Sequence, residues 1–206
     1  MSEKRFLSAD IATMEQRYRA AFMNSLSGVK SANLIGTSQG RHVNENLAII
    51  SSVVHIGANP PLLGMIMRPH TVVRDTLENI QQTGVYTINH VSSEWTEAAH
   101  QTSASYPSNV SEFDATGLTS WYADDFDAPF VQASPVKLAM QLAEIIPIKL
   151  NNTQLVIGEI SSVWIDTNAI TAEGQVNLDQ LGVAAITGLD TYHTINPVGR
   201  YAYAKP

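Results

Sequence analysis

Helical spacing of apolar residues is found at two places along the chain. The first lies near the N-terminus, where apolar side chains recur every three or four residues from Ile11 to Phe22. This period is that of an amphipathic helix, and Ser8 or Asp10 can cap its first turn. We therefore predict an N-terminal helix over about residues 9–25 that packs through one apolar side.

Two further helices are predicted in the middle of the chain. The first begins at a capping residue, Thr71 or Asp75, and Gly84 is placed to end it. The second runs from about residue 92 to about residue 100.

The remaining segments have the pattern of β-strands. They are short apolar or alternating runs rich in β-branched residues, and they cover residues 32–37, 46–56, 62–67, 85–91, 136–150 and 154–166. Asn151-Asn152-Thr153 joins the last two runs as a hairpin, and Glu173-Gly174 forms another tight turn. Residues 102–135 show no clear period and are predicted to be a long loop, of the kind that often binds ligands.

The order of these elements indicates the fold class. Six or more strands and about three helices follow each other without the regular alternation that builds parallel sheets. The pattern predicts an antiparallel barrel, closed or partly open, with helices on its outside. A chain of 206 residues and 22.4 kDa fits a single domain, residues 1–206.

Composition and charge add two constraints. Charged residues make up 15% of the chain, below the average of about 25%, so part of the surface is neutral or covers another subunit. The net charge of −7, with no basic stripe, argues against nucleic-acid binding. An anionic ligand would need a local cationic site that works against this overall charge.

Several classes of site and location are excluded by what the sequence lacks. There is no cysteine, and therefore no disulfide, thiolate zinc site or cysteine nucleophile. There is no secretory h-region and no apolar run of about 18 residues, so we expect a cytoplasmic protein that does not enter a membrane. No dinucleotide fingerprint, P-loop, nucleophile elbow or pair of histidines at metal spacing occurs, so no metal site is predicted.

A series of short motifs is more specific than any of these features. In order they are Asn46-Leu47-Ala48, Ser51-Ser52, Asn59-Pro60-Pro61-Leu62, Met67-Arg68-Pro69, Asp75-Thr76-Leu77-x-Asn79-Ile80, Thr83-Gly84, Ile88-Asn89, Thr102-Ser103-Ala104, Tyr106-Pro107, Glu112-Phe113, Gly117-Leu118-Thr119, Ser134-Pro135-Val136 and Leu155-Val156-Ile157-Gly158-Glu159. Their order and spacing resemble the flavin reductase-like family with the FMN-binding split-barrel fold. The resemblance covers about residues 28–205.

The resemblance implies a fold and an activity. The fold is mainly β, an antiparallel split β-barrel of the Greek-key type with flanking α-helices. Two copies form a homodimer that holds FMN, in some relatives FAD, near the subunit contact. Many family members transfer hydride from NADH or NADPH, bound as a transient substrate, to the flavin. Others bind FMN without enzymatic activity or carry electrons, which is the alternative function for this chain.

The resemblance also assigns positions around the flavin. The ring and ribityl chain are contacted by the segment with Asn46, Leu47, Ala48, Ser51 and Ser52. The phosphate is held by the segment with Arg68, His70, Thr71 and Arg74. A later loop approaches the cofactor with Thr102 and Ser103. No side chain is assigned a catalytic role, because hydride transfer between two cofactor rings needs no acid or base from the protein.

A physical argument supports the phosphate positions. The phosphate of FMN carries about −1.5 to −2 charges. Arg68 and Arg74 flank a predicted helix start, where backbone N–H groups also attract anions. The guanidinium groups would supply the local positive charge that the acidic chain needs for this ligand.

Two departures from the family leave the stacking partner of the flavin ring open. Relatives often carry Pro and an aromatic residue where this chain has Ile49 and Ile50, and an aromatic residue where Ser52 stands. Tyr106, or a residue of a second subunit, could stack on the ring instead. Two other uses of the barrel are oxidation of a pyridoxal-type phosphate, for which no second basic cluster is visible, and a structural dimer that has lost its cofactor.

Overall fold

The structure, a computed structural model, describes residues 3–69, 75–107 and 109–205. Within these ranges the helices are α1 (Ser8–Thr13), α2 (Gln16–Leu26), α3 (Asp75–Thr83), α4 (Thr96–Gln101) and α5 (Glu112–Thr116), with a 3-10 turn η1 (Thr167–Ala169). The strands are β1 (Lys30–Ser31), β2 (Asn33–Thr37), β3 (Asn46–Ile50), β4 (Val54–Ala58), β5 (Pro61–Met67), β6 (Val85–His90), β7 (Ser120–Trp121), β8 (Phe130–Val131), β9 (Val136–Ile148), β10 (Thr153–Ile165), β11 (Ala184–Thr187) and β12 (Thr191–Thr194).

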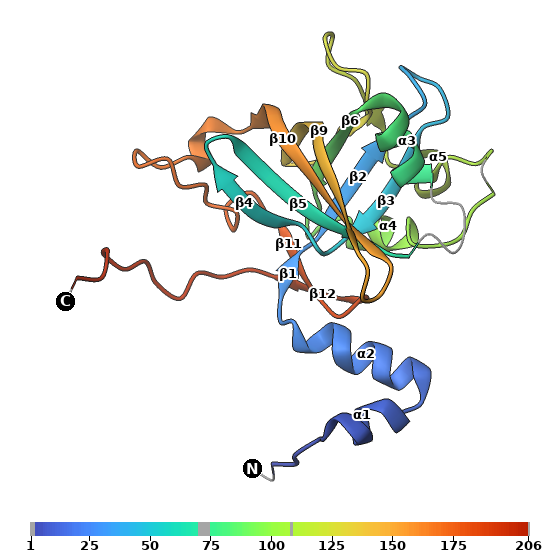
Figure 1. The fold of residues 1–206 in the computed structure, drawn as a ribbon. Coiled ribbons are helices and arrows are strands. Elements are labelled where there is room, and N and C mark those ends of the chain that lie inside the picture. The colour runs from blue at the N-terminus through green and yellow to red at the C-terminus, as the bar shows by residue number, and fades with distance from the viewer. Residues whose placement is uncertain (1–2, 70–74, 108, 206) are drawn as a thin grey trace.

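Seven strands form one antiparallel sheet in the order β3-β2-β6-β9-β10-β5-β4. Strands β3 and β4 lie at its two opposite edges, although only residues 51–53 separate them in the chain. Four residue steps reach at most about 14 Å, whereas six strand spacings in a flat sheet would measure about 29 Å. The sheet is therefore rolled, so that its two edges approach each other (Figure 1).

Smaller elements cover the rolled sheet and extend from it. Strands β1, β11 and β12 form a second sheet, and β7 pairs with β8. Helix α3 contacts β2 and β3, and α5 contacts β3. Helices α1 and α2 contain no buried residue, and they extend away from the barrel together with the C-terminal tail (Figure 1).

Neighbouring residues on β2 point into two different cores, as alternation along a strand requires. Ile35 faces the barrel interior, where it packs in a cluster that includes Met65, Tyr86, Ile88, Met140 and Val156. Leu34 faces the outer side of the sheet, in a cluster that includes Leu47, Val91, Ala99, Phe113 and Ile186. The second cluster attaches α4 and α5 to the outside of β2 and β3.

The prediction of a mainly β, antiparallel fold with flanking helices is confirmed. The hairpin at residues 151–153 and the tight turn at Gly174 are also present, the latter closed by a bridge between Ile170 and Val176. Among the described residues no ladder joins β3 to β4. No helix of the described ranges is long and apolar enough to cross a membrane.

Several predicted boundaries differ from the structure. The segment predicted as one N-terminal helix is two helices, because Glu15 caps α2 through a hydrogen bond from the Tyr18 N–H to its carboxylate (2.9 Å). The helix predicted from about residue 92 begins at Thr96, since Ser92 instead forms a strand bridge with Val183. Residues 102–135, predicted as a loop, contain α5, β7 and β8.

The strand predicted over residues 46–56 is broken into β3 and β4. Ser51-Ser52 interrupts the apolar run at the break, but two serines are also compatible with a continuous strand, so the break was not predicted. The break is where the chain crosses from one edge of the rolled sheet to the other.

Candidate functional site

Strand β3 offers a free backbone edge. Within the described residues it pairs only with β2, so the N–H and C=O groups of alternate residues point away from the sheet. One of them, the Leu47 N–H, donates a hydrogen bond to Glu112 Oε2 on α5 (2.9 Å). By the same alternation the N–H of Ile49 points outward and has no partner in the ladder. The outer edge of β3 can therefore donate to a ligand beyond residue 47.

Ser52 fixes the end of this edge against β5. Its Oγ accepts a hydrogen bond from the Ile66 N–H and donates one to the Ile66 carbonyl, both at 3.1 Å. These bonds continue the antiparallel register of β4 on β5, in which Val54 is opposite Gly64. The register places residues 50–52 beside residues 66–68, so Ser51 and Arg68 lie on adjacent stretches of chain.

Arg68 and Ser51 have free polar groups at this place. Arg68 is exposed directly after β5, and it has no hydrogen bond or ion pair within the described part of the chain. The hydroxyl of Ser51, which is half-buried, also has no hydrogen-bond partner there. An unpaired guanidinium and a free hydroxyl on neighbouring stretches of chain, next to a free backbone edge, fit an anionic ligand with a polar body.

Of the other predicted positions, some lie along β3 near the candidate site and others are buried in the core. Asn46 and Leu47 are buried, and the side chain of Asn46 donates to Thr37 and Thr76 rather than to solvent. Ala48 is half-buried in the middle of β3. The side chains of Asn46 and Leu47 are therefore used inside the protein, and of the two only Leu47 directs backbone groups to the outer edge of β3.

Thr102 and Ser103 follow α4, whose Ala99 belongs to the outer cluster. Thr102 is buried, and its hydroxyl donates to the Ala99 carbonyl (2.8 Å), so it closes the helix. Ser103 is exposed. His70, Thr71 and Arg74, the remaining predicted phosphate positions, lie outside the described residues.

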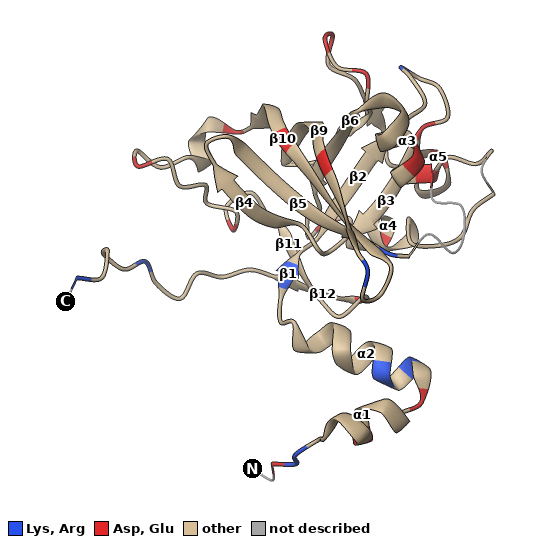
Figure 2. Ribbon diagram, in the orientation of Figure 1, with Lys and Arg blue, Asp and Glu red and all other residues tan. Residues whose placement is uncertain are grey.

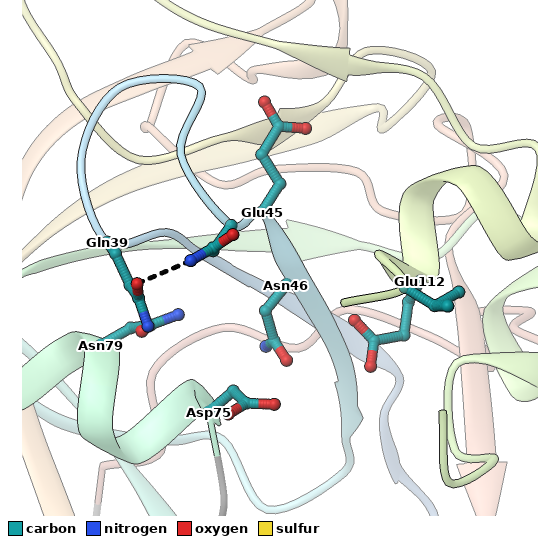
Figure 3. A pocket seen from close by; sticks show the side chains of 8 residues that line it. Gln39, Glu45, Asn46, Asp75, Asn79 and Glu112 are labelled. Carbon is teal, nitrogen blue, oxygen red and sulfur yellow. Dashed lines mark hydrogen bonds between the residues drawn. The ribbon is translucent and has the colours of Figure 1, made fainter. Parts of the chain in front are cut away.

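A cavity that the sequence did not reveal opens at the start of β3. It measures about 150 Å³ and is lined by Gln39, Asn44, Glu45, Asn46, Asp75, Asn79, Val110 and Glu112. Figure 3 shows the carboxylates of Asp75 and Glu112 and the amide of Asn46 pointing toward one another. These side chains come from α3, α5 and β3, which are far apart in the sequence, so no local motif brings them together.

Charge around this cavity is negative. Acidic residues lie on α3 and α5 (Figure 2), and none of the described residues that line the cavity is Lys, Arg or His. Burial raises the pKa of the Glu112 carboxyl, and the nearby charge of Asp75 raises it further, while hydrogen bonds from the backbone of Leu47 and of Glu112 itself lower it. Over the described residues, no group of three or more His, Asp or Glu side chains could hold a metal ion.

Comparison with known families identifies the chain. Residues 26–179, about three quarters of its length, match the model of the flavin reductase like domain. The chain belongs to this family. The resemblance of its motifs to that family is thereby confirmed, and family membership supports flavin binding and oxidoreductase activity.

Solved structures with the same fold include proteins from several bacteria. A candidate flavin reductase with a split barrel domain from Shewanella frigidimarina NCIMB 400 is 51% identical, with a TM-score of 0.93 over 98% of this chain and 100% of that chain. Nitrilotriacetate monooxygenase component B from Bacillus cereus is 17% identical, with a TM-score of 0.83 over 97% and 100%. Flavoredoxin from Desulfovibrio vulgaris is 22% identical, with a TM-score of 0.72 over 85% and 92%. The last two share the fold alone.

Proposed function

We propose that this protein is an NAD(P)H-dependent oxidoreductase that binds FMN and transfers hydride to it. The observation that carries the proposal is the free outer edge of β3 beside the unpaired guanidinium of Arg68. This arrangement occurs in a member of the flavin reductase family, with a 51% identical candidate flavin reductase among its structural neighbours.

The residues of the chain have separate tasks in this proposal. The outward N–H of Ile49 and the Ser51 hydroxyl donate hydrogen bonds to the flavin and the ribityl chain, and Arg68 pairs with the phosphate. Ser52 holds these groups in place through its two bonds to Ile66. When bound, FMN supplies the hydride acceptor, so the protein needs to position two rings and to shield them from water.

We further propose that the protein acts as a homodimer. Apolar side chains are exposed on the edge strand β4, at Val54 and Ile56, and along the N-terminal helices. An exposed apolar edge strand invites pairing or coverage by another chain. A second copy is the occupant that the proposal assigns to these surfaces.

The second candidate function is an FMN-binding electron carrier without NAD(P)H activity. The fold of Desulfovibrio vulgaris flavoredoxin favours it, because that protein has the same barrel with a TM-score of 0.72. The two functions share the flavin site and differ only in the reductant.

An absorption spectrum distinguishes the two functions. The protein is saturated with FMN, freed of excess ligand, and mixed with NADH or NADPH in the absence of oxygen. We expect the flavin absorption near the visible maximum to bleach within the time of mixing for at least one nucleotide. Retained FMN that bleaches with dithionite but with neither nucleotide would establish the electron carrier, and failure to retain FMN would contradict both functions.

A matched pair of variants links the spectrum to the site. Ser51→Ala removes a free hydroxyl at the β3 edge, and Ser162→Ala removes an exposed hydroxyl on β10. We expect only the first to weaken FMN retention, by roughly 3- to 10-fold for one lost hydrogen bond.

A further inference from the structure

The free edge of β3 offers contacts to the polar rim of a flavin ring and none to its faces. Backbone N–H groups and a hydroxyl bond to the nitrogen and oxygen atoms of such a ring, close to its plane. The two faces of the ring are apolar, and aromatic side chains stack on planar rings of this kind. The outward residues of β3, Leu47 and Ile49, are aliphatic. The proposed flavin site therefore has no stacking partner on β3.

Most aromatic side chains of the described chain already have a partner. Every Phe and Trp of the barrel, and Tyr86, packs in one of the three hydrophobic clusters. Tyr122 packs against His42 and Tyr192 against His100, and the aromatic residues of the N-terminal segment pack on one another. Among the described residues, three tyrosines remain outside these groups, namely Tyr106, Tyr201 and Tyr203.

Tyr201 and Tyr203 are the most exposed aromatic side chains of the described chain, at 85% and 90%. They lie on the C-terminal tail, residues 195–205, which forms no helix, strand or backbone hydrogen bond within the described ranges. Tyr106, by contrast, is half-buried, and its hydroxyl accepts a hydrogen bond from Gln101 at the end of α4 (2.8 Å). Tyrosine is enriched where one surface binds another, so this exposed pair is available for a ligand or a second surface.

The charge of the tail is opposite to that of the whole chain. Residues 195–205 include Arg200 and Lys205 and no Asp or Glu, so the tail is cationic in a protein with a net charge of −7 (Figure 2). These cations attract an anionic ligand that the rest of the chain repels. The tail therefore offers a flavin nucleotide both an aromatic surface and positive charge.

The tail of the same chain is directed away from this site. In Figure 1 it runs out on one side of the barrel, and β3 and α5 lie on the other. Arg200 holds this course through an ion pair with Glu173, in the turn that contains Gly174 (3.2 Å). The tail that is free to reach the β3 edge is therefore that of a second copy, which the proposed homodimer brings to the barrel.

We propose that the C-terminal tail of a second copy completes the flavin site, with the ring of Tyr201 or Tyr203 stacked on the face of FMN. The inference rests on the proposed flavin binding and homodimer, and it adds the residues of the second chain that contact the ligand. In an extended chain residues 201, 203 and 205 point to the same side, so the two rings form one surface with Lys205 beside it.

Calorimetric titration with FMN tests the proposal through paired substitutions. Tyr201→Ala combined with Tyr203→Ala, the Ala pair, removes both rings and should raise the dissociation constant about 5- to 150-fold, the effect of one lost stacking contact. Tyr201→Phe combined with Tyr203→Phe keeps both rings and should leave the constant unchanged. Phe is a poorer electron donor than Tyr and quenches flavin emission less, so the fluorescence of bound FMN should rise in the Phe pair. A purely structural role would not produce this split.

Val198→Ala is the matched control, because it removes an exposed apolar side chain from the same tail without removing a ring. Its dissociation constant for FMN should equal that of the unchanged protein, and all tail variants should remain dimers in light scattering. Weaker binding in Tyr106→Ala, with none in the Ala pair, would assign the stacking to Tyr106 and overturn the proposal. A monomeric Ala pair would also overturn it, since the tyrosines would then hold the subunits and not the ligand.

Mixed dimers show which chain supplies the tail. Chains with Arg68→Ala are co-expressed with chains that carry the Ala pair, and Ser51→Ala replaces Arg68→Ala if the latter binds FMN normally. One site of each mixed dimer then combines an intact β3 edge with an intact tail from the other chain. We expect a fraction of sites with the affinity of the unchanged protein, which neither variant shows alone. Absence of this fraction would mean that the tail does not act on the other chain.

The same measurements separate this inference from the proposed function. An unchanged protein that retains no FMN would contradict the flavin site itself. FMN that is retained equally by the unchanged protein and by the Ala pair would leave the flavin site in place and overturn only the role of the tail.

Discussion

Arg68 is the described residue on which phosphate recognition depends most directly. It is exposed at the end of β5, with no partner within the described ranges, so its guanidinium is available to an anion. A charge-assisted hydrogen bond contributes about 1.5–3 kcal/mol, so Arg68→Ala should raise the dissociation constant for FMN about 10- to 150-fold. Fluorescence quenching of FMN on titration with the protein measures this change.

The control for Arg68 is Arg17→Ala, on α2, which removes an exposed guanidinium far from β5 in the fold (Figure 1). It should leave the affinity for FMN unchanged. If Arg68→Ala and Arg17→Ala have the same small effect, the phosphate is held elsewhere.

His90 makes stability depend on pH. Its Nδ1 is covered from solvent and unpaired, and burial lowers the pKa of the ring from its usual value near 6.5 to about 4. The unfolded chain therefore binds a proton between these values that the folded chain does not, and stability falls as the pH falls from 6.5 toward 4. Each pKa unit corresponds to about 1.4 kcal/mol, so the loss between pH 6.5 and 4.5 is about 2–3 kcal/mol.

Urea unfolding at a series of pH values measures this loss. His90→Gln removes the titrating group, and its stability should change little over the same window. A parallel pH dependence in the two proteins would assign the proton uptake to another group.

At the scale of elements, the bond network of Ser52 keeps the break between β3 and β4 in register with β5. Ser52→Ala removes both the donor and the acceptor that Ile66 uses. We expect a loss of about 1–2 kcal/mol in the free energy of unfolding, because the hydroxyl is only partly buried, and a weaker affinity for FMN, because Ser51 and Arg68 separate.

Urea unfolding and FMN titration measure the two effects of Ser52→Ala. Ser162→Ala on β10 is the matched control and should change neither quantity. Loss of stability without any change in FMN affinity would separate this link from the ligand site.

The elements themselves were predictable where one physical signal dominates. A short apolar run predicted β5, alternation predicted β6, and β-rich runs predicted the β9–β10 hairpin, while the glycine after α3 has the positive φ of 74° that ends a helix. The break in residues 46–56 was not predicted, because Val53 and Val54 resume β-branched residues after Ser51-Ser52 and two serines do not by themselves end a strand. Only the closure of the rolled sheet forces the chain to leave one edge there.

The candidate site, too, was predictable only in part. The β3 segment and Arg68 were predicted from the resemblance, and the structure brings them together through Ser52 and Ile66. The cavity at the start of β3 was not predicted, since Asp75 and Glu112 stand 37 positions apart in the sequence and meet only because α3 and α5 both pack on β3.

At the scale of the whole molecule, the N-terminal helices need a second surface to pack against. Helices of 6 and 11 residues are marginal alone in water, and α1 and α2 bury none of their residues. They expose Leu7, Tyr18, Met23 and Leu26. We expect light scattering to give twice the 22.4 kDa mass of one chain, and deletion of residues 1–27 to shift the protein toward the monomer.

The deletion has a control in the C-terminal tail, which also extends from the barrel (Figure 1). Removal of residues 197–206 should leave the dimer intact if the helices are the main contact. A mass near 22 kDa for the full chain at micromolar concentration would contradict the dimer.

Ligand selection also depends on the charge of the whole molecule. The contacts along β3 are common to FMN and riboflavin, whereas Arg68 binds only the phosphate, so we expect a preference for FMN at low salt.

This preference should depend on salt. The net charge of −7 repels the phosphate at long range, and the exposed guanidinium attracts it at short range. The Debye length is about 10 Å at 0.1 M salt and about 3 Å at 1 M, so added salt screens both effects. Because Arg68 is exposed, the attraction is screened strongly, and the preference should fall about 3-fold or more between 0.05 and 1 M salt. Calorimetric titration of both ligands at the two salt concentrations measures it, with riboflavin as the internal control for salt effects on the ring. Equal affinities at low salt would show that the phosphate contributes nothing to binding, and Arg68 would then lie outside the flavin site.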